Sequence, residues 1–410
     1  MKAFSRWALI PFVIILCTLL PACVQPATLT KGNSSHTSSV PDEAVASGTP
    51  LRQANSSSAD GYYSIDTPFS SPLITYIDYK TSQRIILCAR PECGHNDPSC
   101  TAFCMDSSSY TPSLFVVGDY LYRLQSVASE ISAPNIMRSA LDGSNPEEFC
   151  QFPSNWDLGL IAYTDDESLF FLVNYADKES AQLHWSVISV NLDTGTYESL
   201  YQFELDQSVG YVFTTFDRNL VIKLYPQNLP GGAPAECRLF NVDTCQLSDP
   251  IVQVDNEEVG IFAEGNTLFL VDYENEQLRL CNMANSEWTS ISYAPLCDSI
   301  NSPVNKPFVF YVFDEWLRFE FWDSENYATQ ACFLFNMESQ EFIPFDLRMS
   351  YNENWITILQ IRGDNLLVQS DWLVEQDGET VTNVNAQFAF ISKNDFLNSR
   401  PVYQLISSQW

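Results

Sequence analysis

Positive charge is scarce in this chain. Its 410 residues include 20 lysines and arginines against 51 aspartates and glutamates, which gives a formal net charge of −31. Backbone binding to nucleic acid needs clustered Lys and Arg, so nucleic acid is excluded as an expected partner. The same balance disfavours adhesion of the folded part to anionic lipid, and it predicts a soluble, self-repelling surface.

Long apolar runs are also missing. The longest begins after the basic start of the chain and covers residues 7–20, which is too short for a comfortable bilayer span. It closes with Leu20-Pro21-Ala22-Cys23. This sequence resembles the bacterial lipobox. The resemblance implies a lipoprotein signal peptide over 1–22, cleaved after Ala22, and a lipid on Cys23 that anchors the chain to the outer, extracytoplasmic face of the cell membrane.

Residues 23–59 lack apolar periodicity. They are rich in Ser and Thr, include His36, and cannot bury enough surface to offset the entropy lost on ordering. We therefore expect a disordered tether between Cys23 and the folded part of the chain.

No sustained helical period occurs from residue 60 onward. Short alternating strands separated by Asn, Asp, Gly, Ser and Pro predict an all-β fold. A strand that runs into a turn recurs, as in "SVNLDTGTY" (189–197), "LFNVDTCQL" (239–247) and "LFNMESQEF" (334–342). The shared Asn or Asp suits a tight hairpin, because its side chain bonds the backbone two residues on.

Seven such hairpins, each preceded by an apolar strand, fit a repeat of about fifty residues, the size of a four-stranded propeller blade. We expect a single β-propeller over residues 60–410 with seven four-stranded blades, while six or eight blades stay open. The segment "NIMRSALDGSNPEEF" (135–149) resembles the second half of a YWTD-type propeller repeat. As a whole the chain resembles bacterial lipoproteins with TolB-like or YWTD-like propellers and no assigned function, a resemblance that implies fold and location and no chemistry.

Cysteine is concentrated in one place, the insert expected between the first two blades (89–117) and the residue before it. The spacing Cys-x4-Cys-x-His-x4-Cys gives three thiols and an imidazole, the donor set of a closed zinc site: Cys88, Cys93, His95 and Cys100. Disulfides that staple the same loop are an alternative, with Cys93–Cys100 or Cys88–Cys100 as pairs, and so are free thiols. Cys104 has no place in the four-ligand set, so a Cys104–Cys150 side bridge is a further hypothesis.

Catalytic motifs are absent from the sequence. It contains no Gly-x-Ser-x-Gly and no phosphate-cradling glycine loop, and His184 lies on an expected strand away from any nucleophile motif. We therefore expect a ligand- or protein-binding propeller without catalysis, with a carbohydrate, peptide or protein as its ligand. Aromatic residues in 319–327 and 370–380 would suit such a surface. The alternative is an extracellular carbohydrate-active hydrolase or lyase on the same scaffold.

Overall fold

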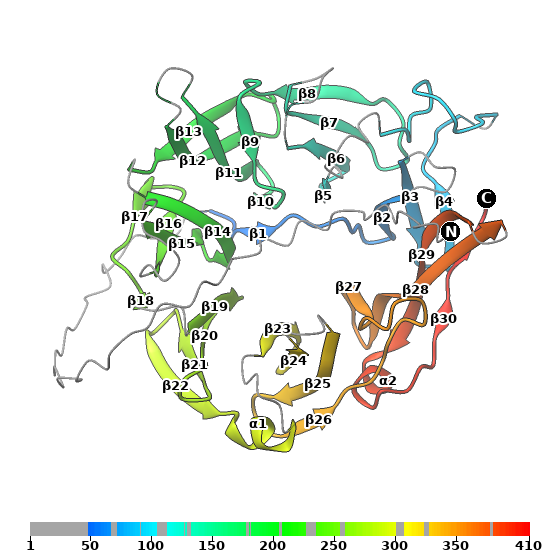
Figure 1. Ribbon diagram of the computed structural model, residues 1–410. Helices are drawn as coiled ribbons and strands as arrows, with labels where there is room; N and C mark the ends of the chain where they lie inside the picture. The colour runs from blue at the N-terminus through cyan, green and yellow to red at the C-terminus, as the bar shows by residue number, and fades with distance from the viewer. Residues whose placement is uncertain are drawn as a thin grey trace, which may run out of the picture.

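Seven β-sheets stand around a common axis in the computed structural model, so the protein is a seven-bladed β-propeller (Figure 1). The structure describes residues 48–66, 72–90, 92–104, 113–126, 128, 133–177, 180, 182–204, 207–226, 235–254, 259–300, 307–323, 328–377 and 380–410. The all-β class and the count of seven blades are confirmed, and six or eight blades are excluded. The predicted signal peptide and Cys23 lie outside the described residues, as does His36.

The blades follow one another along the chain, each with its first strand nearest the axis (Figure 1). Blade 1 consists of β2 (Gly61–Asp66), β3 (Leu73–Asp78), β4 (Gln83–Ile86) and the C-terminal β31 (Ser407–Ser408). Blade 2 consists of β5 (Ser113–Val117), β6 (Tyr120–Gln125), β7 (Asn135–Ala140) and β8 (Glu147–Gln151). Blade 3 consists of β1 (Arg52–Gln53), β10 (Tyr163–Thr164), β11 (Ser168–Ala176), β12 (Leu183–Asn191) and β13 (Tyr197–Gln202), with β9 (Trp156–Leu158) also paired to β11.

The remaining four blades have the same order. Blade 4 consists of β14 (Gln207–Phe216), β15 (Asn219–Pro226), β16 (Ala235–Asn241) and β17 (Gln246–Leu247), with β18 (Val252–Val254) also on β16. Blade 5 consists of β19 (Val259–Glu264), β20 (Thr267–Asp272), β21 (Gln277–Asn282) and β22 (Glu287–Ser292), and is followed by α1 (Ala294–Ile300). Blade 6 consists of β23 (Phe308–Phe313), β24 (Trp316–Asp323), β25 (Ala328–Asn336) and β26 (Phe342–Pro344). Blade 7 consists of β27 (Thr357–Arg362), β28 (Asn365–Asp377), β29 (Thr380–Ser392) and β30 (Gln404–Leu405), with α2 (Lys393–Leu397) before β30.

The recurring Asn closes the hairpins, as its place in the repeat predicts. Asn191 Oδ1 accepts hydrogen bonds from the backbone N–H of Asp193 and of Thr194, at 3.1 and 2.9 Å. Asn241 and Asn336 make the same pair of bonds in blades 4 and 6. The fourth residue after the Asn then adopts a positive φ, as Gly195 does at +70°.

The hydrophobic core is divided between the blades. Each of the seven junctions between neighbouring sheets holds one cluster of buried side chains, for example Phe115, Phe171 and Ile188 between blades 2 and 3. Both faces of the sheets are therefore covered, and strands such as β11 and β20 carry consecutive buried residues, which explains the short apolar runs of the sequence.

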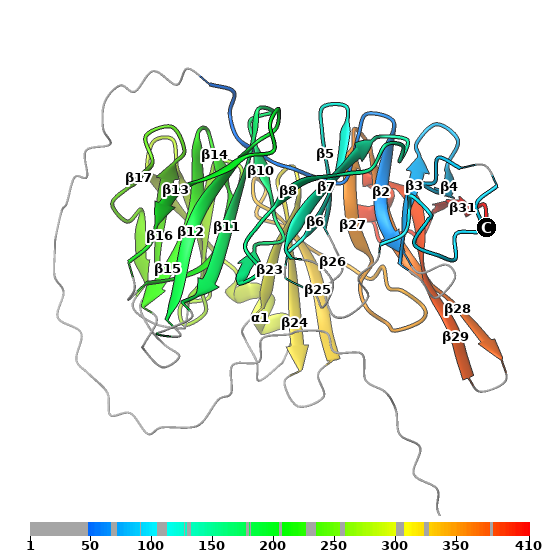
Figure 2. The same cartoon turned by 90° about the horizontal axis from the view of Figure 1, so that it is seen from above.

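Both ends of the described chain tie blades together. At the C-terminus, β30 completes blade 7 and β31 then pairs in parallel with β4 of blade 1. At the N-terminus, residues 49–58, here called the N-terminal strap, run past the innermost strands of blades 4, 3, 2 and 1 (Figure 1). Seen from above, the chain enters the ring at the edge that carries the β5–β6 and β27–β28 turns (Figure 2).

The strap bonds to each blade that it passes. Leu51 N–H donates to Asp217 O (2.8 Å) in blade 4, and β1 pairs with β10 in blade 3. Asn55 O accepts from Val116 N–H (2.8 Å) in blade 2, and Ser56 O accepts from Tyr63 N–H (2.8 Å) in blade 1. The composition of the sequence predicted that the disordered tether extends to residue 59. The structure shows instead that residues 48–59 are ordered, because their backbone groups form hydrogen bonds with the inner strands and turns of the blades.

Candidate functional site

Three thiols and one imidazole converge in the insert that follows β4. Cys88, Cys93, His95 and Cys100 each direct a ligand atom into one small volume, and these four atoms all lie within 4.8 Å of one another. Cys93 N–H donates to Arg90 O (3.3 Å), and Cys100 N–H donates to Asp97 O (3.0 Å), so two tight turns fold the loop back on itself. The sequence spacing therefore predicted the convergence of this set.

Neighbouring donors make one of the thiols acidic. Burial opposes ionisation of Cys88, but hydrogen bonds with the Arg90 backbone, the Thr101 hydroxyl and the other two thiols outweigh it and lower the Cys88 pKa to about 6. Arg90 Nη2 donates to Cys93 Sγ at 3.0 Å. Burial raises the pKa of Cys100 to about 12. The site thus combines a thiol with a lowered pKa, a guanidinium beside a second sulfur, and a buried thiol with a raised pKa.

This arrangement fits a tetrahedral metal. With Zn–S bonds of about 2.3 Å, the ligands of a tetrahedral site lie about 3.8 Å apart, within the separation found here. The cluster could therefore hold a metal such as zinc. The structure holds all ten described cysteines as thiols, and disulfide pairing inside the insert stays a prediction.

The insert also packs between two blades. Ala102 O accepts from Ile74 N–H (2.8 Å) of blade 1, and Phe103 O accepts from Arg123 Nη1 (3.0 Å) of blade 2. Cys100 and Cys104 belong to the core cluster between these two blades. A metal ion or a disulfide that stabilises the closed insert would therefore also stabilise the junction of blades 1 and 2.

The structure does not bring Cys104 and Cys150 together. Cys104 is buried between blades 1 and 2, whereas Cys150 lies on β8 and is buried between blades 2 and 3. The sheet of blade 2 separates the two clusters, so the hypothetical side bridge has no support. Burial raises the pKa of the Cys150 thiol to about 12, as expected for a cysteine that acts as a small apolar side chain.

His184 has a packing role. Its ring stacks on Tyr175 with the ring centres 5.1 Å apart and 10° between the planes, and its Nδ1 lies 3.1 Å from Gln202 Nε2. Three aromatic side chains of the stretches 319–327 and 370–380 pack in the core. Phe319 and Phe321 are buried between blades 5 and 6, and Trp372 packs against the core of blades 6 and 7. They supply core, not an open ligand surface.

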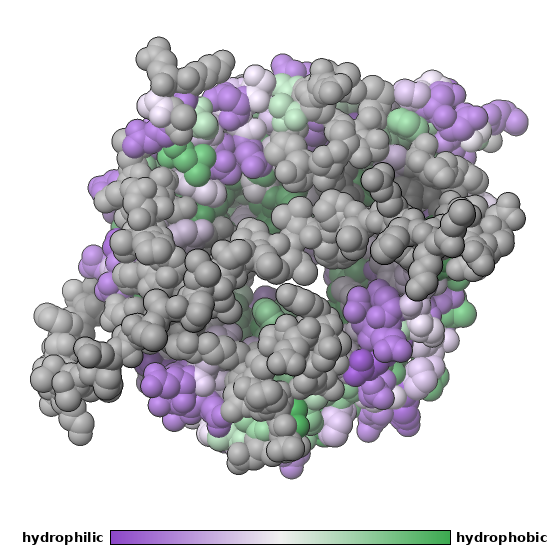
Figure 3. All heavy atoms as spheres, viewed as in Figure 1, coloured by the Kyte–Doolittle hydropathy of each residue, from purple (hydrophilic) through white to green (hydrophobic). Residues whose placement is uncertain are grey.

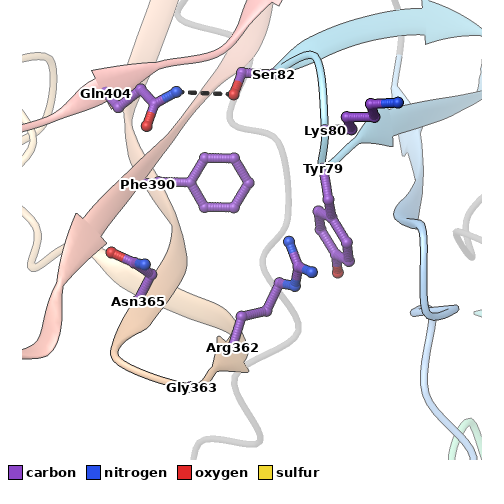
Figure 4. A pocket seen from close by; sticks show the side chains of 8 residues that line it. All are labelled: Tyr79, Lys80, Ser82, Arg362, Gly363, Asn365, Phe390 and Gln404. Atoms are coloured by element: carbon purple, nitrogen blue, oxygen red, sulfur yellow. Dashed lines mark hydrogen bonds between the residues drawn. The ribbon is translucent and has the colours of Figure 1, made fainter.

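A second candidate site lies where the ring closes. A pocket of about 510 Å³ opens between blades 1 and 7 (Figure 4). Its residues come from the β3–β4 turn, the β27–β28 turn and strands β29 and β30: Tyr79, Lys80, Ser82, Arg362, Gly363, Asn365, Phe390 and Gln404. The two turns lie about 280 residues apart in the sequence, and only the closure of the ring brings them together.

An aromatic ring orders the guanidinium in this pocket. Arg362 Cζ lies 3.7 Å from the centre of the Tyr79 ring, a cation–π contact that Figure 4 shows from the side. The Tyr79 hydroxyl lies 2.6 Å from Ser57 Oγ of the strap, and its ring meets Phe390 edge-on. Sequence reasoning missed this site, because neither turn carries a motif.

The arrangement of the sheets places the chain in the structural class of seven-bladed β-propellers, and neither the fold nor the two sites identify a family. No family model matches the sequence, and no curated protein matches it. Solved structures are similar in fold. An oligogalacturonate lyase in complex with manganese aligns with a TM-score of 0.51 at 13% identity, over 84% of this chain and 89% of that one.

Two other solved structures can be compared in the same way, one of them at a TM-score too low to support an inference. A prolyl endopeptidase aligns with a TM-score of 0.51 at 9% identity, over 88% of this chain and 50% of the endopeptidase chain. TolB from Acinetobacter baumannii aligns with a TM-score of 0.36 at 10% identity, over 85% of this chain and 77% of TolB. At such identities the likeness extends to the fold alone.

Proposed function

We propose that this chain is a lipid-anchored, extracytoplasmic propeller that binds a ligand without catalysis. The observation that carries the proposal is the pocket between blades 1 and 7, in which a cation–π contact orders an arginine beside an aromatic wall. Ordered polar groups in a concave site are typical of binding pockets, and loops on a rigid scaffold are where function is usually placed.

A substitution that fills the pocket tests this binding role. Gln404→Trp would place an indole among the lining residues, while Gln246→Trp makes the same change on the outer strand of blade 4, where Gln246 is also exposed. A panel of oligosaccharides and peptides should include compounds that bind the unmodified domain and the Gln246→Trp variant but not Gln404→Trp. If every binder tolerates the filled pocket, the ligand site lies elsewhere.

Anchoring through Cys23 is supported by the lipobox-like end of the apolar stretch. The described chain begins at residue 48 and enters the ring along the strap, so the segment from Cys23 would link a lipid to the propeller. No helix in the described ranges is long and apolar enough to span a bilayer. Labelling with a palmitate analogue in a bacterial host should mark the unmodified chain and leave Cys23→Ser unlabelled in the soluble fraction. Equal labelling of the two chains would contradict the anchor.

Zinc is the metal that we propose for the insert. Cys88, Cys93, His95 and Cys100 would supply the four ligands, and the ion would replace the protons of the thiols and hold the loop closed. Native mass spectrometry of the lipid-free domain should show a zinc-sized addition that denaturation removes. Cys93→Ser should abolish it, whereas Cys104→Ser, which changes a buried thiol outside the ligand set, should keep it. A mass lower by two protons per pair would indicate disulfides instead.

A carbohydrate-active lyase is the second candidate function. The observation in its favour is the fold likeness, over most of both chains, to an oligogalacturonate lyase solved with manganese. Incubation of the domain with oligogalacturonate and Mn²⁺ would produce an unsaturated sugar that absorbs in the ultraviolet if the lyase assignment holds. If the absorbance stays constant with this domain while it rises with an active lyase as the positive control, the lyase function is excluded and the binding function remains.

A further inference from the structure

The charge of the pocket between blades 1 and 7 is opposite to that of the whole molecule. The chain has a net charge of −31. The charged residues that line this pocket, however, are Lys80 and Arg362, and no aspartate or glutamate is among its lining residues. Acidic side chains outnumber basic ones by more than two to one in the sequence, and hydrophilic residues cover much of the described part of the rim that Figure 3 shows. A second pocket, lined in part by Arg123 and Arg138, also has no carboxylate in its lining, but there Arg138 forms an ion pair with Glu147.

Neither cation forms an ion pair within the described ranges, although, after the hydrogen bonds from Thr81, the positive charge of Lys80 is one of the smaller causes that lower the pKa of the Asp78 carboxyl. Most of the described arginines form an ion pair with a carboxylate, including Arg138, Arg218 and Arg400. Within the described ranges no carboxylate oxygen forms an ion pair with Arg362 or with Lys80. The acid nearest in sequence is Asp78, and its Oδ1 accepts hydrogen bonds from Lys80 N–H, Thr81 N–H and the Thr81 hydroxyl, so this oxygen is engaged inside the turn.

The strap holds the arginine in place from behind. Ser57 bonds the Tyr79 hydroxyl, and Tyr79 presents its ring to the Arg362 guanidinium. A guanidinium that stacks on a ring keeps the N–H groups of its edge free, and these can bind a planar anion through two parallel hydrogen bonds. The lining also includes the Asn365 amide, the Phe390 ring and Gln404, whose Nε2 donates to Ser82 Oγ at 2.9 Å (Figure 4).

We propose that this pocket binds a small organic monocarboxylate, with its carboxylate on Arg362 and its carbon skeleton against Phe390, while Lys80 adds positive charge at the rim (Figure 4). The inference rests on the proposed binding function and adds the chemical class of the ligand. A volume of about 510 Å³ accommodates a ligand of one or two sugar rings. Long-range repulsion from an acidic protein grows with the charge of the ligand, so a carboxylate is favoured over a phosphate dianion.

Matched probes test the class of ligand. Calorimetry or ligand-observed NMR on the lipid-free domain would compare galacturonate with galactose, which lacks the carboxylate, and with inorganic phosphate. Galacturonate should bind, and galactose should bind at least about tenfold more weakly. Equal binding of the two sugars, or binding of phosphate in preference to galacturonate, would overturn the proposal.

Variants locate the anion. Arg362→Ala should weaken galacturonate binding about tenfold or more, and Lys80→Ala by a smaller factor, because a lysine offers a single point charge. Arg400→Ala removes the same charge from an arginine that already pairs with Asp395, and it should leave binding unchanged. Binding that survives Arg362→Ala contradicts the assignment, provided that the circular dichroism of the variant matches the unmodified domain.

The failure of this inference differs from the failure of the proposed function. Suppose that neutral ligands bind the unmodified domain and the Arg362→Ala variant but not the Gln404→Trp variant. The pocket is then a binding site, and the proposal that its ligand is a carboxylate is wrong. If no ligand of any class responds to Gln404→Trp, the binding role of the pocket is wrong as well.

Discussion

At the scale of single residues, Arg218 joins three segments of the chain. Its side chain is 9% exposed, and it donates to Thr49 O (2.7 Å) in the strap, to Asp165 (2.9 Å) in blade 3 and to Asp243 (2.6 Å) in blade 4. Removal of one member of a buried ion pair leaves the other charges without a partner. Arg218→Ala should therefore lower the free energy of unfolding by about 2–4 kcal/mol in urea denaturation.

The control for this substitution is Arg400→Ala. Arg400 also pairs with an aspartate, but its side chain is 52% exposed. Exposed pairs contribute about 0–1 kcal/mol. A loss at Arg218 no larger than the loss at Arg400 would show that the three bonds of Arg218 add no stability beyond an ordinary surface pair.

The same ion pair predicts a dependence on pH. Hydrogen bonds from Arg218 hold the pKa of the Asp243 carboxyl below its usual value of 3.8. A carboxyl with a lowered pKa in the folded state stabilises the fold above the unfolded pKa and loses this contribution as the pH falls. The stability gap between the unmodified domain and Asp243→Asn should therefore narrow between pH 6 and pH 3, and a constant gap would show that the carboxylate charge is not what stabilises.

At the scale of elements, the N-terminal strap is a removable part of the propeller. Its backbone bonds to blades 1 to 4, and Leu51 is buried, so these contacts together should contribute about 3–6 kcal/mol. A chain that begins at residue 60 should be less stable by this amount than one that begins at residue 48. Chemical denaturation of the two chains measures the difference, and equal midpoints would mean that the strap only rests on the blades.

A smaller change separates the strap's two roles. Ser57→Ala removes the hydroxyl that bonds Tyr79 and leaves the backbone contacts of the strap in place. It should cost no more than about 1 kcal/mol of stability, yet it should weaken binding in the pocket that Tyr79 helps to order.

The strap also shows which elements the sequence could predict. The hairpins were predictable, because Asn191 and its repeats bond the backbone of their own turns and need no distant partner. The convergence of Cys88, Cys93, His95 and Cys100 was predictable because these residues lie close together in one loop, while metal binding there stays a prediction. The ordered structure of residues 48–58 could not be predicted, because a polar segment that pairs with the edges of other strands has the same composition as a disordered tether. The pocket between blades 1 and 7 could not be predicted either, because Tyr79 and Arg362 come into contact only when the ring closes.

At the scale of the whole molecule, closure of the ring depends on the last few residues. Beyond blade 7, Ile406 is buried against blades 1 and 7, Ser407 N–H donates to Ser82 O (3.2 Å), and Gln409 N–H donates to Arg84 O (3.0 Å). Arg84 is itself buried in blade 1, where it pairs with Asp66 and lies 5.0 Å from the Trp410 ring. The first and last blades thus share one core, and the strap is a second tie at the inner edge of blade 1.

Deletion of residues 404–410 should open this junction first. Blade 7 would lose β30, blade 1 would lose β31, and the Phe388 and Ile77 cluster between them would gain a solvent-exposed edge. We expect the midpoint of thermal unfolding to fall by about 5 °C and hydrogen exchange to rise in blades 1 and 7 before it rises in blades 3 to 5. Gln409→Ala, which keeps the backbone bonds of the closing segment, should change neither. Uniform exchange over all seven blades after the deletion would mean that the ring opens as one cooperative unit, because stability would then be shared around the circle instead of being set at its seam.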